Sequence, residues 1–185
     1  MTSVFSMPAD DIKALPIYQS ILEKSSVDIY LDSPFLPLKL LSSKTKGAKF
    51  EQVLHEHLVL NHYDVAKAGN YDWDRTVNGH KVEIKGSFLW EGGTHFRWQQ
   101  IRINQEYDYV VFLAFYPSCL EIYAADKEAV IAEVTKKDEN GYWIWNQHGG
   151  KKVKEADTFY LDGMPEDFPW MKPLYKIIPP NVALF

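Results

Sequence analysis

Charged side chains on both sides of one predicted turn could bind a metal ion and activate water. The turn is Asn78-Gly79, a dipeptide that favours the two positive φ values of a type I′ hairpin. In such a hairpin, directly opposed residues share one face of the ribbon. Asp74 then faces Glu83 and Asp72 faces Lys85, so all four side chains point the same way. The pattern predicts a cluster of carboxylates beside one ammonium group.

The chemistry of this cluster follows from its charge. Carboxylates that are crowded on one face repel each other unless a cation neutralises them. A hard divalent ion with oxygen ligands is the natural occupant. Lys85 could orient a water molecule or neutralise charge on a substrate oxygen. The alternative is an ordinary polar ribbon face, in which Lys85 forms a cross-strand ion pair with Asp72 or Glu83.

The segments around this hairpin have the periodicities of helices and buried strands. Residues 46–62 have apolar side chains at helical spacing, which predicts a helix. The near-continuous apolar run 110–115 predicts a strand that is buried on both faces. Residues 120–126 suit an antiparallel partner of that strand, and residues 127–137 suit a short helix. The apolar positions of the first helix are Phe50, Val53, Leu54, His57 and Leu58.

Three other segments have interrupted or more polar patterns. Residues 10–25 predict a helix. Pro34 and Pro37 interrupt residues 27–41, which favours an extended connection or an edge strand. Residues 96–107 indicate a polar helix. Together the elements predict an α/β (α+β) fold, in which a mixed central β-sheet is flanked by helices.

The composition excludes several classes of protein. The chain of 185 residues, 46% of them hydrophobic, can bury a core without help from a metal or a disulfide, and we expect one domain over 1–185. The single cysteine, the lack of a signal-type N-terminus and the lack of a long apolar run indicate a soluble protein of a reducing compartment, without membrane contact. The net charge of −5 argues against extensive binding of polyanions but permits a local basic cleft.

Asp74, followed by Glu83-Ile84-Lys85, resembles the motif of the PD-(D/E)xK nuclease superfamily, whose restriction-endonuclease-like fold occurs in type II restriction enzymes. The order of helix, hairpin with Glu-x-Lys, Gln-bearing helix and buried strand adds to the resemblance, which covers a core of about residues 45–130. Tyr71-Asp72-Trp73-Asp74 stands where the motif has its proline. Asp72 therefore remains an alternate for the catalytic aspartate.

The resemblance implies a role for each site residue. Asp74 and Glu83 would bind Mg²⁺, for which Mn²⁺ could substitute, and Lys85 would position the attacking water. Glu51, on the preceding helix, would support a second ion; the alternative is an ordinary exposed helical glutamate. The DNA contacts expected on the Gln-bearing helix are Gln99, Gln100 and Arg102.

A basic segment lies at residues 136–154, where five lysines accompany only two acidic residues. Its polar side chains could read bases and its lysines could hold phosphates, so we expect residues 136–185 to form a C-terminal extension for DNA recognition and dimerisation. The alternative is a solvated hairpin whose aromatic residues pack on the core. The residues expected to contact DNA are Asn146, Gln147 and His148 at base edges, and Lys151 and Lys152 at phosphates.

Two further patches have a candidate role. Lys44, Lys46 and Lys49 form a second basic patch beside Glu51, where phosphate contacts are plausible. The apolar run 175–185 is a candidate dimer interface, and the alternative is a tail folded back on its own core.

The expected function is that of a Mg²⁺-dependent DNA endonuclease of type II restriction character. Such an enzyme would cut double-stranded DNA as a homodimer, since a twofold dimer places one active site at each strand. We expect a cytoplasmic protein that is encoded by a bacterium or by a phage. The alternatives are a repair or junction-resolving nuclease of the same superfamily and a non-catalytic nucleic-acid-binding protein whose carboxylate face is structural.

Overall fold

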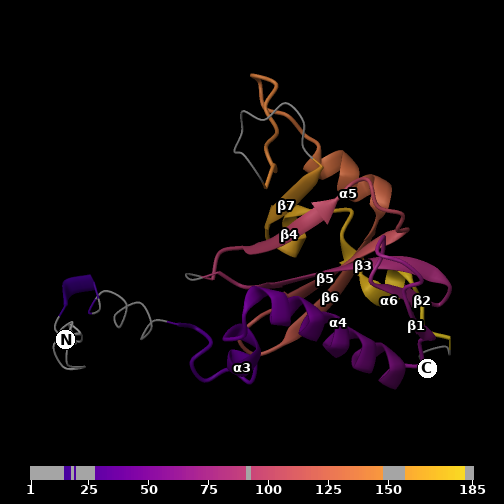
Figure 1. Ribbon diagram of the computed structural model, residues 1–185, viewed down its shortest axis with the longest axis horizontal. Helices are drawn as coiled ribbons and strands as arrows, with labels where there is room; N and C mark the ends of the chain where they lie inside the picture. Colours follow the sequence, from indigo (N-terminus) through magenta and orange to yellow (C-terminus); the bar gives the residue numbers. More distant parts are fainter. Residues whose placement is uncertain (1–14, 18, 20–27, 91–92, 148–156, 182–185) are drawn as a thin grey trace, which may run out of the picture.

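A mixed sheet of six strands runs through the centre of the computed structural model (Figure 1). The structure describes residues 15–17, 19, 28–90, 93–147 and 157–181. β3 and β5 are parallel, and the other neighbouring strands are antiparallel. A second, antiparallel sheet consists of β4 (Phe96–Arg102) and β7 (Thr158–Gly163). The order across the central sheet is β1 (Val65–Lys67), β2 (Arg75–Val77), β3 (His80–Phe88), β5 (Tyr109–Phe115), β6 (Leu120–Asp126) and β8 (Lys172–Pro173).

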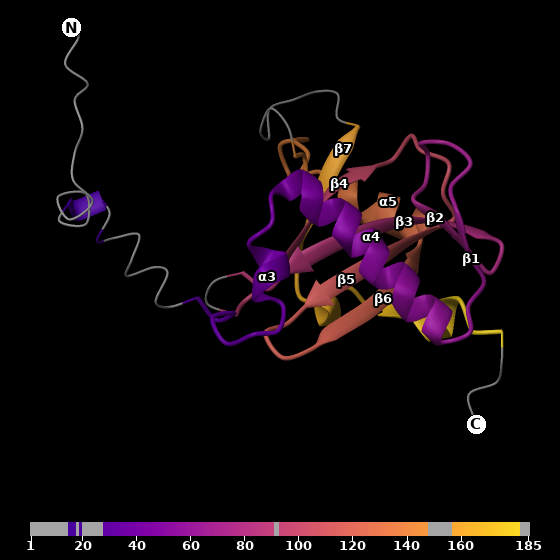
Figure 2. The same ribbon diagram turned by 60° about the horizontal axis from the view of Figure 1, so that its bottom comes forward.

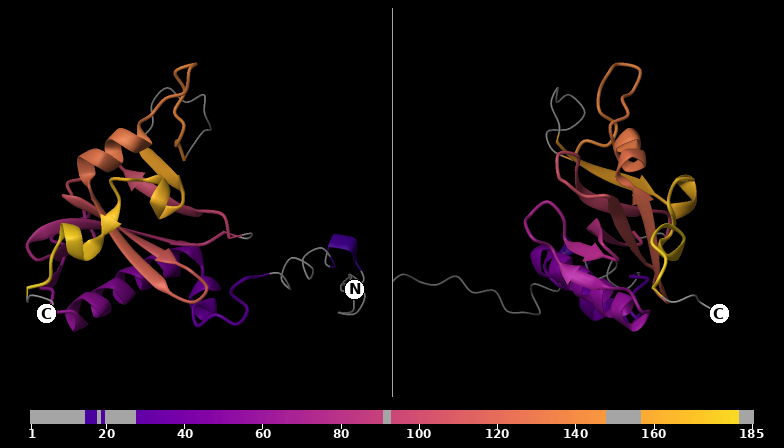
Figure 3. Two further views of the ribbon diagram at one scale, coloured as in Figure 1. Left: turned by 180° about the vertical axis from the view of Figure 1, so that it is seen from behind. Right: turned by 90° about the vertical axis from the view of Figure 1, so that its right-hand side faces the viewer.

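Helices and the second sheet cover the two faces of the central sheet. The long helix α4 (Ser43–Leu60) crosses one face diagonally (Figure 2). The β4–β7 sheet and α5 (Lys127–Val134) lie on the opposite side, as the side view in Figure 3 shows. The predicted fold class, a mixed α+β domain with a central sheet flanked by helices, is confirmed. The short helices are α3 (Leu36–Lys39), a 3₁₀ turn (Pro165–Asp167) and α6 (Leu174–Ile177).

The alternation of side chains along β5 divides the core into two layers. Val110 and Phe112 pack with the aromatic side chains of β4 and β7, whereas Val111 and Leu113 pack with α4. All four side chains are fully buried. Because successive side chains of a strand point to opposite faces, a strand between two layers needs the continuous apolar run that the sequence has at 110–115. The predicted strand is confirmed, and so are its partner β6 and the helix α5.

The hairpin at Asn78-Gly79 is also confirmed. Both turn residues have positive φ, 48° at Asn78 and 84° at Gly79, as a type I′ turn requires. A two-residue turn at Asn78-Gly79 implies that Val77 pairs with His80 and Arg75 with Val82, and both pairs are present in the ladder. The helix predicted over 46–62 is confirmed as α4, which begins earlier because Ser42 caps it: the Ser42 hydroxyl accepts a hydrogen bond from the Thr45 N–H at 3.3 Å. His57, placed in the apolar stripe by its spacing, is exposed instead.

The helix predicted over 96–107 is wrong. Residues 96–102 form strand β4, in which Phe96 and Trp98 alternate with more exposed residues. A β-bulge between Trp98 and Ile101 shifts the next buried residue by one position, so the apolar spacing imitates a helix. The packing of the Trp98 indole, which donates to the Leu113 carbonyl at 3.2 Å, decides for the strand.

The prediction for residues 27–41 is partly wrong, since its described residues contain turns and helix α3 rather than an edge strand. Pro37 lies in the first turn of α3, where the missing N–H has no helical partner to lose. The helix predicted over 10–25 lies almost wholly outside the described residues. Within those residues, no helix is long and apolar enough to span a membrane.

The apolar run 175–185 was a candidate dimer interface, with a tail folded back on its own core as the alternative. Its described part follows the alternative. Ile178 is fully buried against the α4 side of the sheet, next to Leu174. The Asn78 side-chain amide donates to the Pro179 carbonyl at 2.7 Å, which ties the tail to the hairpin turn. Residues 175–181 therefore fold back on their own core.

Candidate active site

The candidate site lies along β3 beyond Val82, where one edge of the strand has no partner among the described residues. β2 is three residues long and its ladder with β3 ends at Arg75–Val82. Beyond Val82, β3 is paired only with β5. A cleft of about 760 Å³ follows this edge, with α4 as one wall and β4 as the other. The short β2 thus leaves the edge of β3 open to a ligand.

All four residues predicted to be catalytic line this cleft. They are Asp74, Glu83 and Lys85 near the hairpin, and Glu51 on α4. The Lys85 ammonium donates to Glu83 Oε1 at 2.5 Å. Glu83 is only 6% exposed, so the ion pair is largely withdrawn from water. The Asp74 carboxylate accepts a hydrogen bond from the Ile84 N–H at 2.7 Å. Asp74 is therefore held against the backbone between Glu83 and Lys85.

The ladder predicted beyond Arg75 does not form. The Asp74 N–H donates to the Val82 carbonyl at 2.9 Å, although Val82 is the residue opposite Arg75. Asp74 is thus not a ladder partner of Glu83, and its carboxylate bonds to the β3 backbone instead. Asp72 does not line the cleft, and its N–H is bonded to Asn70 Oδ1 at 2.9 Å. Of the two candidate aspartates, Asp74 is the one at the site.

Negative charge is concentrated around Asp74. Burial raises the pKa of Glu83 to about 7; the Lys85 ammonium opposes this rise and Asp74 adds to it. Burial also raises the pKa of Glu51, and Asp74 adds to that rise while Arg75 opposes it. Arg75 binds Glu51 Oε2 at 3.1 Å. Asp74 thus repels two carboxylates whose pKa burial already raises, and a cation bound among the three would relieve this repulsion.

The donor set suits a hard divalent cation with an incomplete protein shell. Asp74 and Glu83 offer carboxylate oxygens, the donors that Mg²⁺ prefers. Among the described residues, no group of three or more acidic, histidine or cysteine side chains is close enough to hold an ion. An ion here would keep several water or substrate oxygens, as Mg²⁺ commonly does. Two carboxylates therefore fit a single open site better than a closed structural one.

The β4 wall carries the three residues that were predicted to contact DNA, but they lie on a strand instead of a helix. Gln99, Gln100 and Arg102 all line the cleft. Successive strand residues ordinarily point to opposite faces. The bulge changes this, since Gln100 takes a φ of +59° that is unusual for a residue other than glycine. The Gln100 N–H is held by Gln147 Oε1 at 2.5 Å.

The basic segment of residues 136–154 is only partly described. Asn146 is 8% exposed and forms a β-bridge with Phe159, so its side chain is not presented to a ligand in this structure. Gln147 binds the bulge, as above. His148, Lys151 and Lys152 lie outside the described residues.

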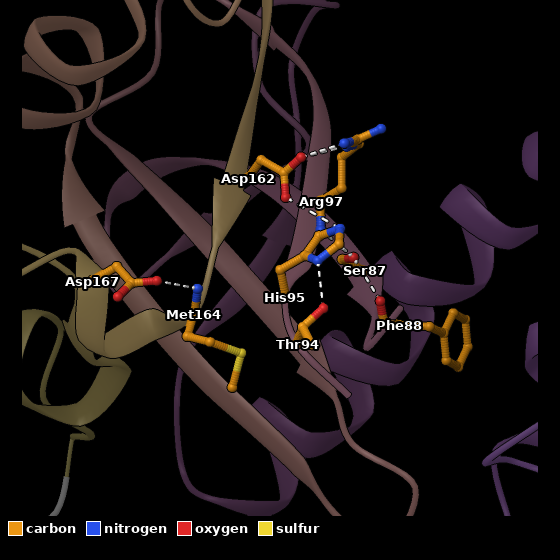
Figure 4. A network of polar contacts seen from close by, with 8 residues as sticks. All are labelled: Ser87, Phe88, Thr94, His95, Arg97, Asp162, Met164 and Asp167. Atoms are coloured by element: carbon orange, nitrogen blue, oxygen red, sulfur yellow. Dashed lines mark hydrogen bonds and ion pairs between the residues drawn. The ribbon is translucent and has the colours of Figure 1, made fainter. Parts of the chain in front are cut away.

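A polar network that the sequence patterns did not indicate includes Ser87 and Arg97, which line the cleft (Figure 4). Arg97 of β4 forms a two-pronged ion pair with Asp162 of β7. Its guanidinium lies 4.8 Å from the centre of the Trp90 ring, and its backbone N–H donates to the Ser87 hydroxyl of β3 at 2.9 Å. His95 also approaches Asp162, at 3.4 Å. The assignment of residues 96–107 to a helix concealed this link among β3, β4 and β7.

Comparison with known proteins finds similarity to solved structures only at the level of the fold. No family model and no curated protein matches the chain. The chain is similar in structure to a bacterial homing endonuclease, I-Ssp6803I, with 15% sequence identity and a TM-score of 0.46. The similarity covers 75% of this chain and 91% of that one.

Proposed function

We propose that the chain is a metal-dependent DNA endonuclease that hydrolyses phosphodiester bonds. The observation that supports this most is the convergence of Asp74, Glu83 and Lys85 in one open cleft. The walls of the same cleft carry cationic and amide side chains, which suit the backbone and the base edges of a nucleic acid. Mg²⁺ is the proposed ion, and Mn²⁺ should substitute because it accepts the same oxygen donors.

The proposed roles follow from the contacts. Asp74 and Glu83 would bind the ion, which when bound supplies charge stabilisation at the attacking or leaving oxygen. The Ile84 N–H fixes the Asp74 carboxylate, so that group is oriented before a ligand arrives. Lys85 is held at Glu83 by the ion pair and would turn its ammonium group toward the attacking water. Glu51 would act as a supporting carboxylate, since Arg75 already engages one of its oxygens.

Within this proposal, the finer assignment is a type II-like restriction enzyme that cuts double-stranded DNA as a homodimer. One cleft cuts one strand per visit, so double-strand cleavage is most simply reached by a twofold dimer. A repair or junction-resolving nuclease is the alternative that uses the same site. The buried ion pair between Lys85 and Glu83 favours a second candidate function, a non-catalytic nucleic-acid-binding protein, because such a pair could be purely structural.

Cleavage of supercoiled plasmid DNA tests the proposal. Mg²⁺ or Mn²⁺ should support nicking or linearisation, Ca²⁺ should allow binding without turnover, and a chelator should stop the reaction. Glu83→Gln should be inactive, while the exposed control Glu139→Gln should cleave like the wild type. Binding without cleavage under every metal condition would support the scaffold function instead. Sequencing of the cut ends separates a restriction enzyme, which leaves defined ends, from an enzyme that prefers branched DNA.

A further inference from the structure

Most cationic side chains in the cleft are neutralised by a nearby carboxylate. Among the described residues, no carboxylate forms an ion pair with the other two, Lys46 and Arg102. The positive charge of Arg102 acts on Glu83, where it opposes the rise that burial causes in the pKa of Glu83. Lys46 therefore remains as an unpaired cation on the α4 wall. The neutralised pairs are Lys39 with Asp28, Lys85 with Glu83, and Arg97 with Asp162.

Lys46 occupies a place where a positive charge is costly without a ligand. Its side chain is half-buried. The face of the Phe88 ring, whose centre lies 5.4 Å from the ammonium, attracts this charge only weakly. Burial, and then the charge of Lys39, lowers the pKa of Lys46. An anion bound in the cleft would relieve both the desolvation and the repulsion.

Gly47, the next residue of α4, leaves open space beside this lysine. Glycine inside a helix is less stable than alanine and usually has a packing or functional reason. Gly86 has a packing reason, since a Cβ there would lie 2.3 Å from the Phe50 ring. At Gly47 a Cβ would meet nothing within 4 Å, and the residue lines the cleft. A ligand could therefore approach the helix backbone closely at this point.

The positions of Lys46 and Gly47 on the helix distinguish them from the other basic residues of α4. Residues three and four apart on a helix share a face. Lys44 and Lys49, by contrast, are exposed and do not line the cleft, and the Lys49 ammonium bonds to Gln52 at 2.9 Å. The α4 residues that do line it are Ser43, Lys46, Gly47, Phe50 and Glu51.

We propose that Lys46 and Gly47 form a phosphate-binding strip, which holds the backbone of the substrate strand beside the scissile phosphate. This inference rests on the proposed nuclease function. Lys46 lies five residues before Glu51, or about 7.5 Å along the helix at about 1.5 Å per residue. Lys46 would thus bind a phosphate of the same strand near the reacting one, while Gly47 lets the strand come close.

Two matched pairs of variants test the strip. Lys46→Gln removes the charge on the cleft face, and Lys49→Gln removes the same charge from the outer face. Gly47→Gln fills the open space, and Ala48→Gln adds a side chain of the same kind at an exposed position outside the cleft. Binding to a labelled DNA duplex is measured in Ca²⁺ over a range of salt concentrations. Thermal unfolding of each full-length variant is measured beside it.

The strip predicts weaker DNA binding for the two cleft variants and unchanged binding for their two controls. Lys46→Gln should bind several-fold more weakly and should reduce the slope of log K against log salt by about 0.9, the loss of one phosphate contact. Lys49→Gln should keep the wild-type slope. Gly47→Gln should unfold at a higher temperature because glutamine is the better helix former, and yet bind DNA more weakly. Ala48→Gln should not weaken binding.

Three outcomes would overturn the strip. They are an unchanged slope in Lys46→Gln, an equal loss in Lys49→Gln, and unaltered binding by Gly47→Gln. Each can occur while the wild type still cleaves plasmid DNA, which would leave the nuclease proposal standing. A wild type that binds DNA through Lys46 without cleaving it would support the strip and contradict the nuclease.

Discussion

Gln147 Oε1 accepts a hydrogen bond from the backbone N–H of Gln100 at 2.5 Å, and this contact joins segments 47 residues apart. It lies at the bulge of β4, where Gln100 has a φ of +59°. The bulge is what brings both Gln99 and Gln100 to the cleft. Gln147, for which the sequence suggested contacts with bases, has its side-chain oxygen engaged in supporting the β4 wall.

Removal of this acceptor should loosen the bulge. Gln147→Ala is expected to lower the free energy of unfolding by about 1 kcal/mol, because it removes one hydrogen bond and leaves the Gln100 N–H without its partner. Gln147→Glu retains an acceptor oxygen and should lose less. Urea unfolding of the two variants measures the difference. Equal losses would show that the hydrogen bond does not hold the bulge.

The backbone strain at Gln100 should appear in a comparison with its neighbour. Glycine removes the cost of a positive φ, which is roughly 1–2 kcal/mol for other residues, but it also raises the entropy of the unfolded chain. Gln99 has no positive φ, so Gln99→Gly has only the second effect. Gln100→Gly should therefore be the more stable variant by about 1 kcal/mol in urea unfolding. The reverse order would contradict the bulge geometry.

The two aspartates before β2 should differ sharply in their effect on cleavage. Asp74→Asn should abolish plasmid cleavage, because Asp74 lines the cleft and its charge would bind the ion. The asparagine oxygen can still accept from the Ile84 N–H, so the fold should be retained. Asp72→Asn serves as the control and should keep most of the activity, since Asp72 lies outside the cleft. An inactive Asp72→Asn beside an active Asp74→Asn would reverse the assignment.

Lys85→Ala should destabilise the protein as well as inactivate it. Its partner Glu83 is 6% exposed, and loss of the ammonium leaves a buried carboxylate unpaired. Breaking such a pair typically costs about 3–5 kcal/mol. The loss should be smaller at pH 5 than at pH 8, because Glu83 can take up a proton at the lower pH. Urea unfolding at both pH values measures this, and an equal loss would argue against a buried charge at Glu83.

Glu83 should also give the wild type a distinct pH dependence of stability. Burial raises its pKa from 4.5 to about 7 in the folded state, so between these values the folded protein binds more protons than the unfolded chain. Stability from this group is then present below about pH 4.5 and is lost as pH rises through about 7. Over that window the loss amounts to roughly 2–4 kcal/mol.

Glu83→Gln should remove this pH dependence, because glutamine does not titrate. Glu51 has a pKa shifted in the same direction and leaves a smaller slope of the same sign. Glu139→Gln is the exposed control and should keep the wild-type profile. Urea midpoints between pH 4.5 and pH 8 decide the matter. A Glu83→Gln profile that coincides with the wild type would assign the dependence to another group.

Local patterns in the sequence were enough for the elements whose geometry depends on near neighbours. The turn chemistry of Asn78-Gly79 sets the first ladder pairs of the hairpin, because the two strands meet directly at the turn. The apolar periods of α4 and β5 follow from burial on one face and on two faces, respectively. The residue types Asp, Glu and Lys near the hairpin likewise indicated the candidate chemistry.

The tertiary structure alone decided how these side chains are arranged. The three-residue spacing from Trp98 to Ile101 suits a helix until β7 and the core contribute partners, and only then does a bulged strand bury both side chains together with Phe96. The choice between Asp72 and Asp74 depends on a backbone N–H across the hairpin, which periodicity does not encode. The physical reason is that packing and long-range hydrogen bonds, such as Arg97 to Asp162 across 65 residues, outweigh local preference.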